Sequence, residues 1–476
     1  MAAVRRFAPA LLRRELMQLS VLAGPLVLAQ LAQMSMGFVD TLMAGRLGPD
    51  ALAGIALGSV VLGFVTIVSM GVLFSVAPSV SQAHGAGRSS EAARAARQGL
   101  WLAAGLALPG IALFQVATPL LIAAGQDPAT AELAGAYLRA VSPGLLPSLA
   151  LVALRGFLEG LGDARPIMTI LLAGVALNVV ADQAFMFGRW GAPALGLVGT
   201  GVATTLVYTT MALAAALYVA LRYRSYRVLR GLRRPDPVVL RDLIRVGWPI
   251  GVTLGFEAGL FSATALLMGL FGREALAGHQ IAIQAASITF MLPVGLSIAT
   301  GVRVGQAAGR QDLAAVRRAG VAGILAAATV MLGTAALFRF APGLVVAAFL
   351  DVGDPRNAEV IRYATTFLGL AAAFQVVDGI QVAASGALRG LRDTRVPMVI
   401  SLVAYWALGM TTSLALGFLA GFGGRGLWAG LVVGLGTAAI LLTRRFLRMS
   451  APSSATVDAV PGSQGGVHSG PWERSS

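Results

Sequence analysis

Four acidic residues stand inside long apolar runs of the sequence: Asp40, Asp182, Glu257 and Asp378. An ionised acid at the centre of a bilayer costs about 2.5–3.5 kcal/mol on insertion scales, so four together would cost on the order of 10 kcal/mol. Acids that are this costly to bury are seldom structural accidents. We therefore expect these residues to bind something that cancels their charge.

The first two acids are expected at a similar depth, with further oxygen donors beside them. Asn178 precedes Asp182 by four residues, which puts both side chains on one face of a helix. Thr200 lies about one turn into the next predicted helix, which returns from the outside, so it can approach the same level. With Asp40, this cluster offers only oxygen ligands, which suit protons or hard cations. The alternative is that Asn178 and Thr200 only hydrogen-bond helix to helix.

Glu257 and Asp378 form a second group, whose alternative role is to be buried, protonated and part of the helix packing. A carboxyl group held away from water can be neutralised by a proton, a metal cation or a cationic substrate, but not fully by all of them at once. Binding of one occupant then weakens binding of another, which is the thermodynamic basis of exchange transport.

The composition indicates that most of this chain lies in a lipid bilayer. Of its 476 residues, 57% are hydrophobic and only 12% are charged. Backbone polar groups in lipid require helices or closed barrels, and these long continuous runs favour helices of roughly 20 residues. We predict twelve transmembrane helices, at residues 17–43, 51–78, 98–123, 133–158, 166–188, 196–221, 243–271, 275–300, 315–340, 358–387, 397–420 and 426–447.

The basic residues set the orientation. The net charge of +15 comes from 36 basic residues, all arginine, that cluster between the apolar runs, so nucleic acid is not the expected partner. With the N-terminus in the cytoplasm, only eight arginines fall outside, and the positive-inside rule then places both termini in the cytoplasm. The outer eight are Arg46, Arg139, Arg189, Arg273, Arg339, Arg356, Arg362 and Arg425.

An internal repeat divides the chain. At an offset of 224, Pro25 matches Pro249 and Gln82 matches Gln306; later the offset becomes 230, and Asp163 matches Asp393. The shift of six residues predicts an insertion near residues 350–355. Six helices per half make the repeats parallel, as in secondary transporters whose substrate site lies between the halves.

The repeat gives a domain plan. We predict a cytoplasmic segment at 1–16, an N-lobe at 17–222, a basic cytoplasmic linker at 223–242, a C-lobe at 243–448 and a disordered cytoplasmic tail at 449–476. Pro25 removes a hydrogen bond from the first helix, so it is a candidate hinge that responds to Asp40, or else a static kink.

Four segments together resemble the multidrug and toxic compound extrusion (MATE) transporters, especially NorM-like bacterial members. They are Met36-Gly37-Phe38-Val39-Asp40-Thr41-Leu42-Met43-Ala44-Gly45, Gln82-Ala83-His84-Gly85-Ala86-Gly87-Arg88, Ala277-Gly278-His279-Gln280 and Leu388-Arg389-Gly390-Leu391-Arg392-Asp393-Thr394-Arg395. The resemblance covers residues 15–448 and implies a V-shaped pair of six-helix lobes.

The resemblance also implies residue roles. It assigns cation coupling, by sodium or protons, to Asp40, Asn178, Asp182, Thr200, Glu257 and Asp378. We expect the substrate cavity to include Gln33, Phe256, Gln280 and Phe374. Two residues depart from the NorM-like pattern: Asp182 stands where asparagine is expected, and Phe374 where tyrosine is expected. These departures leave the coupling ion and the dominant lobe open.

The predicted function is secondary efflux of lipophilic, often cationic organic compounds in exchange for protons or sodium, by a monomer in the bacterial inner membrane with no cofactor. A lipid-linked oligosaccharide flippase is an alternative, but it would need a strongly cationic central cavity, whereas the charges expected inside the membrane here are acidic. A channel or a membrane enzyme is a further alternative, although the sequence contains no P-loop, nucleophile elbow or metal motif.

Overall fold

The computed structural model describes residues 9–232 and 234–451, and in this part of the chain every regular element is helical. Among these described residues, twelve helices are long and apolar enough to cross a membrane, which confirms the predicted number. The helices are α1 (Pro9–Gly45), α2 (Pro49–Leu73), α3 (Val76–Gly85), α4 (Ser89–Gln115), α5 (Ala117–Ala123), α6 (Pro128–Leu161), α7 (Arg165–Phe187), α8 (Leu197–Arg222), α9 (Pro237–Gly269), α10 (Arg273–Gly309), α11 (Leu313–Phe340), α12 (Pro342–Ala347), α13 (Ala358–Gly390), α14 (Arg395–Leu402), α15 (Thr411–Leu414) and α16 (Gly424–Met449).

Two spanning segments are irregular. The second consists of α2 and α3, which meet at residues 74 and 75. The eleventh runs through α14, a π-helical stretch η6 (Val403–Met410), α15 and a second π-helical stretch η7 (Ala415–Leu419). Both irregularities lie within predicted spans, where hydropathy alone gives no sign of them.

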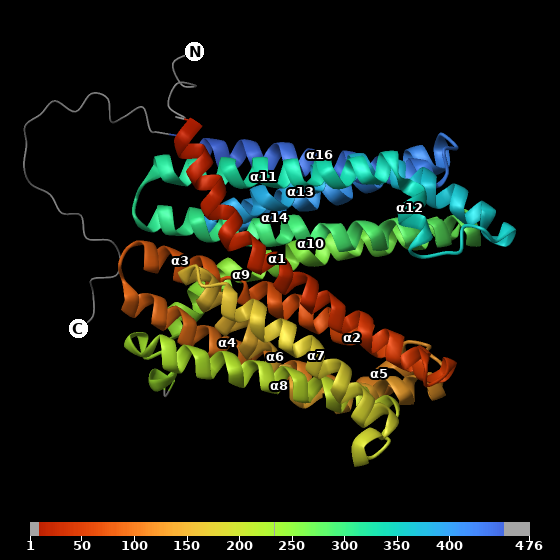
Figure 1. Ribbon diagram of the computed structural model, residues 1–476, viewed down its shortest axis with the longest axis horizontal. Helices are drawn as coiled ribbons and strands as arrows, with labels where there is room; N and C mark the ends of the chain where they lie inside the picture. The colour runs from red at the N-terminus through yellow and green to blue at the C-terminus, as the bar shows by residue number, and fades with distance from the viewer. Residues whose placement is uncertain (1–8, 233, 452–476) are drawn as a thin grey trace, which may run out of the picture.

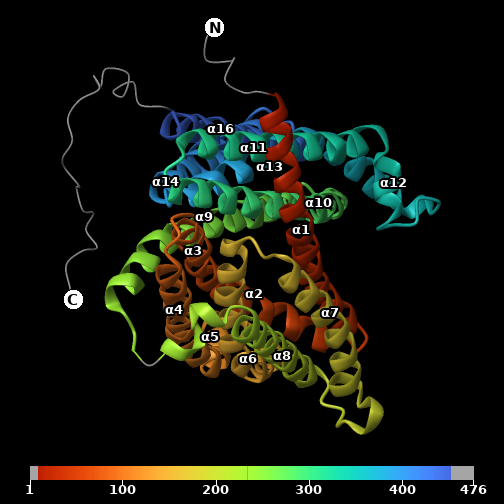
Figure 2. The ribbon, with the colours of Figure 1, turned by 60° about the vertical axis from the view of Figure 1, so that its left-hand side comes forward.

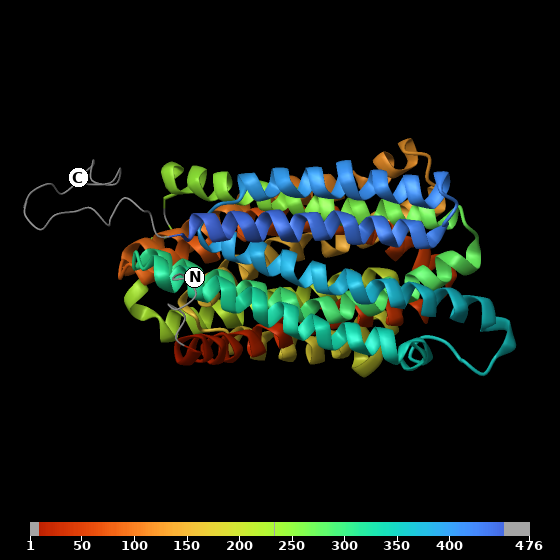
Figure 3. The same cartoon turned by 90° about the horizontal axis from the view of Figure 1, so that it is seen from above.

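The helices form two bundles, α1–α8 and α9–α16, which we call the N-lobe and the C-lobe. Figure 1 shows the lobes close together at the end where α1 begins and α16 ends, and farther apart at the opposite end. We call these the terminal end and the distal end. Seen from above, the long helices run along one common direction (Figure 3). The V-shaped, two-lobed fold is therefore as predicted.

Two helices reach from their own lobe to the other one. α1 contacts α10 and α11 of the C-lobe as well as α2 and α7 (Figure 2). In the same way, α9 contacts α2 and α4 of the N-lobe as well as α10 and α14. An ion pair of 2.8 Å between Arg303 and Glu15 fastens the start of α1 to α10. The helices that carry Asp40 and Glu257 are thus coupled to both lobes.

The structure locates the insertion that the repeat predicted. In the first half, α5 and α6 are separated by residues 124–127, whereas in the second half α12 and α13 are separated by residues 348–357. The second connection is six residues longer, which accounts for the change of offset. It lies at the distal end of the C-lobe and does not alter the helices on either side.

The predicted domain limits differ from the helices at several points. Residues 9–16 belong to α1 and residues 237–242 belong to α9, so both helices continue past the predicted edges of the bilayer. Asp236 begins α9 by accepting hydrogen bonds from the amides of Val238 and Val239 at 3.1 and 3.3 Å. The predictions for residues 1–8 and 452–476 lie outside the described residues.

The lobes touch through small residues, both at the terminal end and about midway along the second span and α9. A Cβ atom added to Gly71 on α2 would lie 2.2 Å from the Cα of Gly251 on α9, so only glycine fits there. Added Cβ atoms at Gly85 and Gly309 would each lie 2.1 Å from a carbonyl oxygen, of Gln306 and Gln82 respectively. These approaches bring the two backbones into contact and close the terminal end.

Candidate functional site

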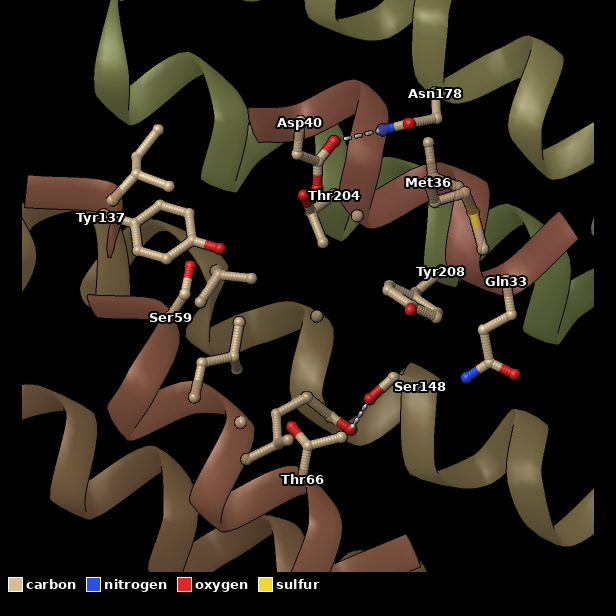
Figure 4. Close-up of a pocket in the computed structure, with 18 of the residues that line it drawn as sticks. Gln33, Met36, Asp40, Ser59, Thr66, Tyr137, Ser148, Asn178, Thr204 and Tyr208 are labelled. Atoms are coloured by element: carbon tan, nitrogen blue, oxygen red, sulfur yellow. Dashed lines mark hydrogen bonds between the residues drawn. The ribbon is translucent and has the colours of Figure 1, made fainter. Parts of the chain in front are cut away.

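A cavity of about 330 Å³ lies inside the N-lobe, between α1, α2, α6, α7 and α8. Its wall carries polar groups from several helices, which Figure 4 shows pointing into the same space. They include Gln33 and Asp40 from α1, Tyr137 from α6, Asn178 from α7 and Thr204 from α8.

One amide group joins the two acids of this lobe. Asn178 Nδ2 donates a hydrogen bond to Asp40 Oδ1 at 2.9 Å and another to Asp182 Oδ2 at 3.4 Å. The second contact follows from the four-residue spacing on α7, whereas the first depends on the packing of α1 against α7. The structure thus brings together Asp40, Asn178 and Asp182, which were chosen from the sequence.

The same cluster leaves several buried oxygens without a partner. Within the described chain, no hydrogen bond reaches Asn178 Oδ1, Asp182 Oδ1, Thr200 Oγ1 or Thr204 Oγ1. Asp182 and Thr200 are both 0% exposed. Buried polar atoms are normally satisfied, so this set has spare capacity to bind a proton or a small cation. Thr200 lies one turn before Thr204 on α8, behind the cavity wall.

The donors here are carboxylate, amide and hydroxyl oxygens. Among the described residues, no group of three or more His, Cys, Asp or Glu side chains is arranged to hold a metal ion.

The C-lobe acids sit differently. Glu257 on α9 lines a central cavity of about 150 Å³ whose wall includes residues of both lobes. Asp378 on α13 is 3% exposed, and its Oδ1 has no hydrogen-bond partner in the described chain. One carboxyl group thus faces the cavity while the other lies behind it.

The predicted substrate residues separate in the structure. Gln33 lines the N-lobe cavity, as expected. Phe374 instead packs edge-on against Trp428 and Phe261, with ring centroids 5.6 and 5.9 Å apart. Phe256 is half-buried against the C-lobe core, and Gln280 is exposed on α10. These three residues line neither the N-lobe cavity nor the central cavity. The ring of Phe374 packs on other aromatic side chains of the lobe instead.

Sequence reasoning missed a charged network in the central cavity. Arg155 on α6 donates to Glu159 Oε1 at 2.6 Å and to Gln33 Oε1 at 3.0 Å, and it also contacts Gln30. Arg155, Glu159 and Arg389 line this cavity together with Glu257. The expectation that charges within the membrane are only acidic is therefore wrong.

A signal for this network was present in the sequence. Arg155 and Glu159 are four residues apart and so share one helical face. Glu159 and Arg389 fall one and two residues past the predicted spans that end at 158 and 387, whereas the helices continue to Leu161 and Gly390. A search restricted to acids inside the hydropathy limits excluded all three charges.

Two repeated six-helix lobes, with buried acids facing cavities inside and between them, define a secondary transporter of the parallel-repeat type. The profile of the MatE family matches residues 25–183 and 249–414, once in each half. The chain belongs to this family, that of the multidrug and toxic compound extrusion transporters.

Relatives of similar length agree. The chain is 43% identical over 434 residues to a probable multidrug resistance protein NorM of Pseudomonas aeruginosa, covering 91% of this chain and 89% of the relative. It is 44% identical over 436 residues to a protein of the same name from Deinococcus radiodurans, covering 91% and 95%.

Solved structures share the fold. An outward-facing conformation of a multidrug resistance MATE family transporter aligns with a TM-score of 0.83 at 21% identity, over 92% of this chain and 96% of that chain. The eukaryotic MATE transporter AtDTX14 aligns with a TM-score of 0.79 at 21% identity, over 92% and 98%. At this identity the likeness establishes the fold.

Proposed function

We propose that the chain exports lipophilic, often cationic organic compounds across the inner membrane of a bacterium in exchange for protons or sodium ions. The observation that carries the proposal is the Asn178 amide, which holds the carboxyl groups of Asp40 and Asp182 together while buried oxygens around it lack partners. The names of the NorM relatives, which are probable multidrug resistance proteins, support drugs as the exported compounds.

Competition for the acids provides the coupling. A proton or a sodium ion that binds at Asp40 and Asp182 neutralises the charge that would hold a cationic compound in the N-lobe cavity. Because each occupant weakens the other, entry of the coupling ion drives release of the compound. In this scheme Pro25, inside α1 and fifteen residues before Asp40, is the hinge that transmits the change of charge.

The orientation belongs to the same proposal. Most of the arginines lie at the terminal end, so we assign that end to the cytoplasm. Contact between the lobes at this end and their separation at the distal end then correspond to an outward-open state (Figure 1). Alternating access would require the terminal-end contacts to break and the distal ends to approach.

The flippase alternative is less well supported. A cavity for a pyrophosphate-linked lipid needs an excess of positive charge. The central cavity instead balances two arginines, Arg155 and Arg389, against two acids, Glu159 and Glu257. Such a balanced wall suits neither a strongly anionic lipid nor rapid passage of one kind of ion.

The test is transport of a fluorescent organic cation in inverted membrane vesicles. A pH gradient and a sodium gradient are imposed separately, and the gradient that drives transport identifies the coupling ion. We expect Asp40→Asn and Asp182→Asn to lower gradient-driven transport to background, whereas Glu132→Gln, an exposed acid on α6, leaves it unchanged. Full gradient-driven transport by Asp40→Asn would overturn the proposal.

A further inference from the structure

A second polar cavity lies far from the acids of the transport site, at the terminal end of the C-lobe. It has a volume of about 270 Å³. One part of its wall is the start of α9, with Asp242, Arg245 and Val246. The other part is the segment from Arg392 to Arg395, which leads into α14. Figure 2 shows α14 beside α9 at this end of the molecule, and the two helices are in contact.

The charges of this cavity are only partly paired. Arg392 forms an ion pair with Asp242, and Arg445 forms one with Asp393 at 2.5 Å. Both acids of the cavity are therefore engaged. Arg245 and Arg395 are exposed, and neither has a carboxylate of the described residues within 4.0 Å. The cavity thus keeps a net positive charge, and Arg392 Nε is buried there without a partner.

The repeat shows that this positive charge is not required by the fold. Arg392 corresponds to Gly162 at the offset of 230, and the two loops have the same backbone hydrogen bond. The amide of Arg392 donates to the carbonyl oxygen of Arg389 at 2.8 Å, and the amide of Gly162 donates to that of Glu159 at 2.8 Å. Both residues have left-handed backbones, with φ of 61° for Arg392 and 86° for Gly162. Glycine adopts this conformation freely, whereas a side chain disfavours it, and such strain tends to persist where a residue serves a function.

The other arginines follow the same pattern. Arg245 corresponds to Val21 at the offset of 224, whereas Arg395 matches Arg165. In the N-lobe loop the acid equivalent to Asp393 is Asp163, which accepts hydrogen bonds from Tyr218 and Tyr223 at 2.9 and 2.8 Å. Two of the three cavity arginines are therefore specific to the C-lobe.

Apolar side chains continue from this cavity toward the middle of the membrane. On α9, Trp248 lies one turn deeper than Ile244 and Arg245, and the side chains of Ile244 and Trp248 are exposed. On α14, Val396 and Val399 are exposed beside Arg395. Positive charge at a membrane boundary, followed by an aromatic ring and aliphatic side chains one turn deeper, matches the order of a phosphate headgroup and its acyl chains.

We propose that this cavity binds the phosphate headgroup of an anionic phospholipid from the leaflet at the terminal end, with the acyl chains lying along α9 and α14. Arg245 and Arg395 hold the phosphate, and Arg392 adds its charge to the same wall. The lipid would bridge α9, the first helix of the C-lobe, and α14, which begins the eleventh span of the chain. A soluble phosphate ester could use the arginines but not the apolar surface.

The experiment compares lipids on the full-length protein in detergent. Phosphatidylglycerol and phosphatidylcholine are added separately, and bound lipid is counted by native mass spectrometry while the Tm is followed. We expect phosphatidylglycerol to bind and to raise the Tm more than phosphatidylcholine does. Arg245→Gln/Arg395→Gln should weaken phosphatidylglycerol binding by about tenfold or more, given the usual attraction of an arginine to an anionic surface.

The repeat and α9 supply matched controls. Arg165→Gln removes the N-lobe equivalent of Arg395, and Arg241→Gln removes an exposed arginine one turn from Arg245 that lies outside the cavity wall. Both should keep the lipid effect. If the double variant fails to fold, as shown by its lipid-free Tm, the single variants carry the test.

Two results would overturn the proposal. One is equal binding of phosphatidylglycerol by the double variant and the controls. The other is equal protection by inorganic phosphate or glycerol phosphate at millimolar concentration, which would identify a soluble anion as the ligand. Neither measurement depends on transport, so the result stands apart from the role proposed for Asp40.

Discussion

Gln82 and Gln306 occupy equivalent positions in the two halves, and each donates a side-chain hydrogen bond across the interface between the lobes. Gln82 Nε2 binds the carbonyl oxygen of Gly390 at 2.8 Å, and Gln306 Nε2 binds that of Gly160 at 3.1 Å. The two glycines are themselves related by the offset of 230. The terminal end is therefore held shut by a reciprocal pair of bonds, which we call the glutamine latch.

Removal of the latch should favour the state in which the terminal end is open. Each bond contributes about 0.5–1.5 kcal/mol, so Gln82→Ala/Gln306→Ala is expected to shift the equilibrium by about 2 kcal/mol, or roughly thirtyfold. Because the chain has no cysteine, spin labels at Ser89→Cys and Leu313→Cys report the separation of the lobes without other substitutions. An unchanged distance distribution, matching that of the exposed control Gln126→Ala, would contradict the prediction.

Substitution of the small residues next to the latch should open the terminal end as substitution of the glutamines does. Gly85→Ala or Gly309→Ala places a methyl group 2.1 Å from a carbonyl oxygen of the other lobe, so the closed terminal end cannot form without displacement. The same spin-label pair should report wider separation, and transport should fall. Gly105→Ala has no atom within 4 Å of the new methyl group and should have no such effect. Normal lobe separation in Gly85→Ala would show that the interface has more room than the structure indicates.

Thr200 tests whether the coupling ion uses the oxygens behind the N-lobe cavity. Its hydroxyl is fully buried and unpartnered, so Thr200→Val keeps the shape of the side chain while removing a ligand. We expect Thr200→Val to raise the ion concentration needed for half-maximal transport severalfold, as for loss of one hydrogen bond of about 1 kcal/mol. Thr200→Ser should retain the wild-type value. Identical ion dependence in the valine and serine variants would leave Thr200 a packing residue.

Arg155 and Glu159 should be coupled in stability. Their side chains are only 10% and 7% exposed, so Arg155→Met leaves a buried carboxylate unpaired, at a cost of about 3–5 kcal/mol. Arg155→Met/Glu159→Met removes both charges and should recover most of this loss. Thermal unfolding in detergent measures the single and double variants as a cycle. Additive losses in the double variant would mean that the two side chains do not stabilise each other.

The sequence predicted the architecture well because lipid imposes a simple rule: backbone groups must pair within helices, so apolar runs reveal the spans. The pairing of Asn178 with Asp182 followed from helical spacing in the same way. Their shared contact with Asp40 depends on how α1 packs on α7, which no local pattern encodes, although the expected depths were compatible.

The features that the sequence did not reveal have physical reasons too. The predicted spans end where the apolar runs end, whereas α6 and α13 continue for a few more residues. Glu159 and Arg389 lie in these extensions and were therefore overlooked. Phe374 could not be distinguished from a cavity residue, because the sequence does not reveal that Trp428 and Phe261 fill the space around its ring. The exposure of Gln280 likewise depends on how the helices of the lobe pack, which the sequence does not reveal.

The backbone contact between Gly71 and Gly251 has a consequence for the rate at which the two lobes move relative to each other. Where side chains interlock, two bodies can move past each other only by changing rotamers one after another, and each change adds a barrier. At Gly71 and Gly251 main chain rests on main chain, so α2 and α9 can move at this point without a change of rotamer. We expect the rocking itself to be quick, and each cycle to wait on the exchange of occupants at the acids.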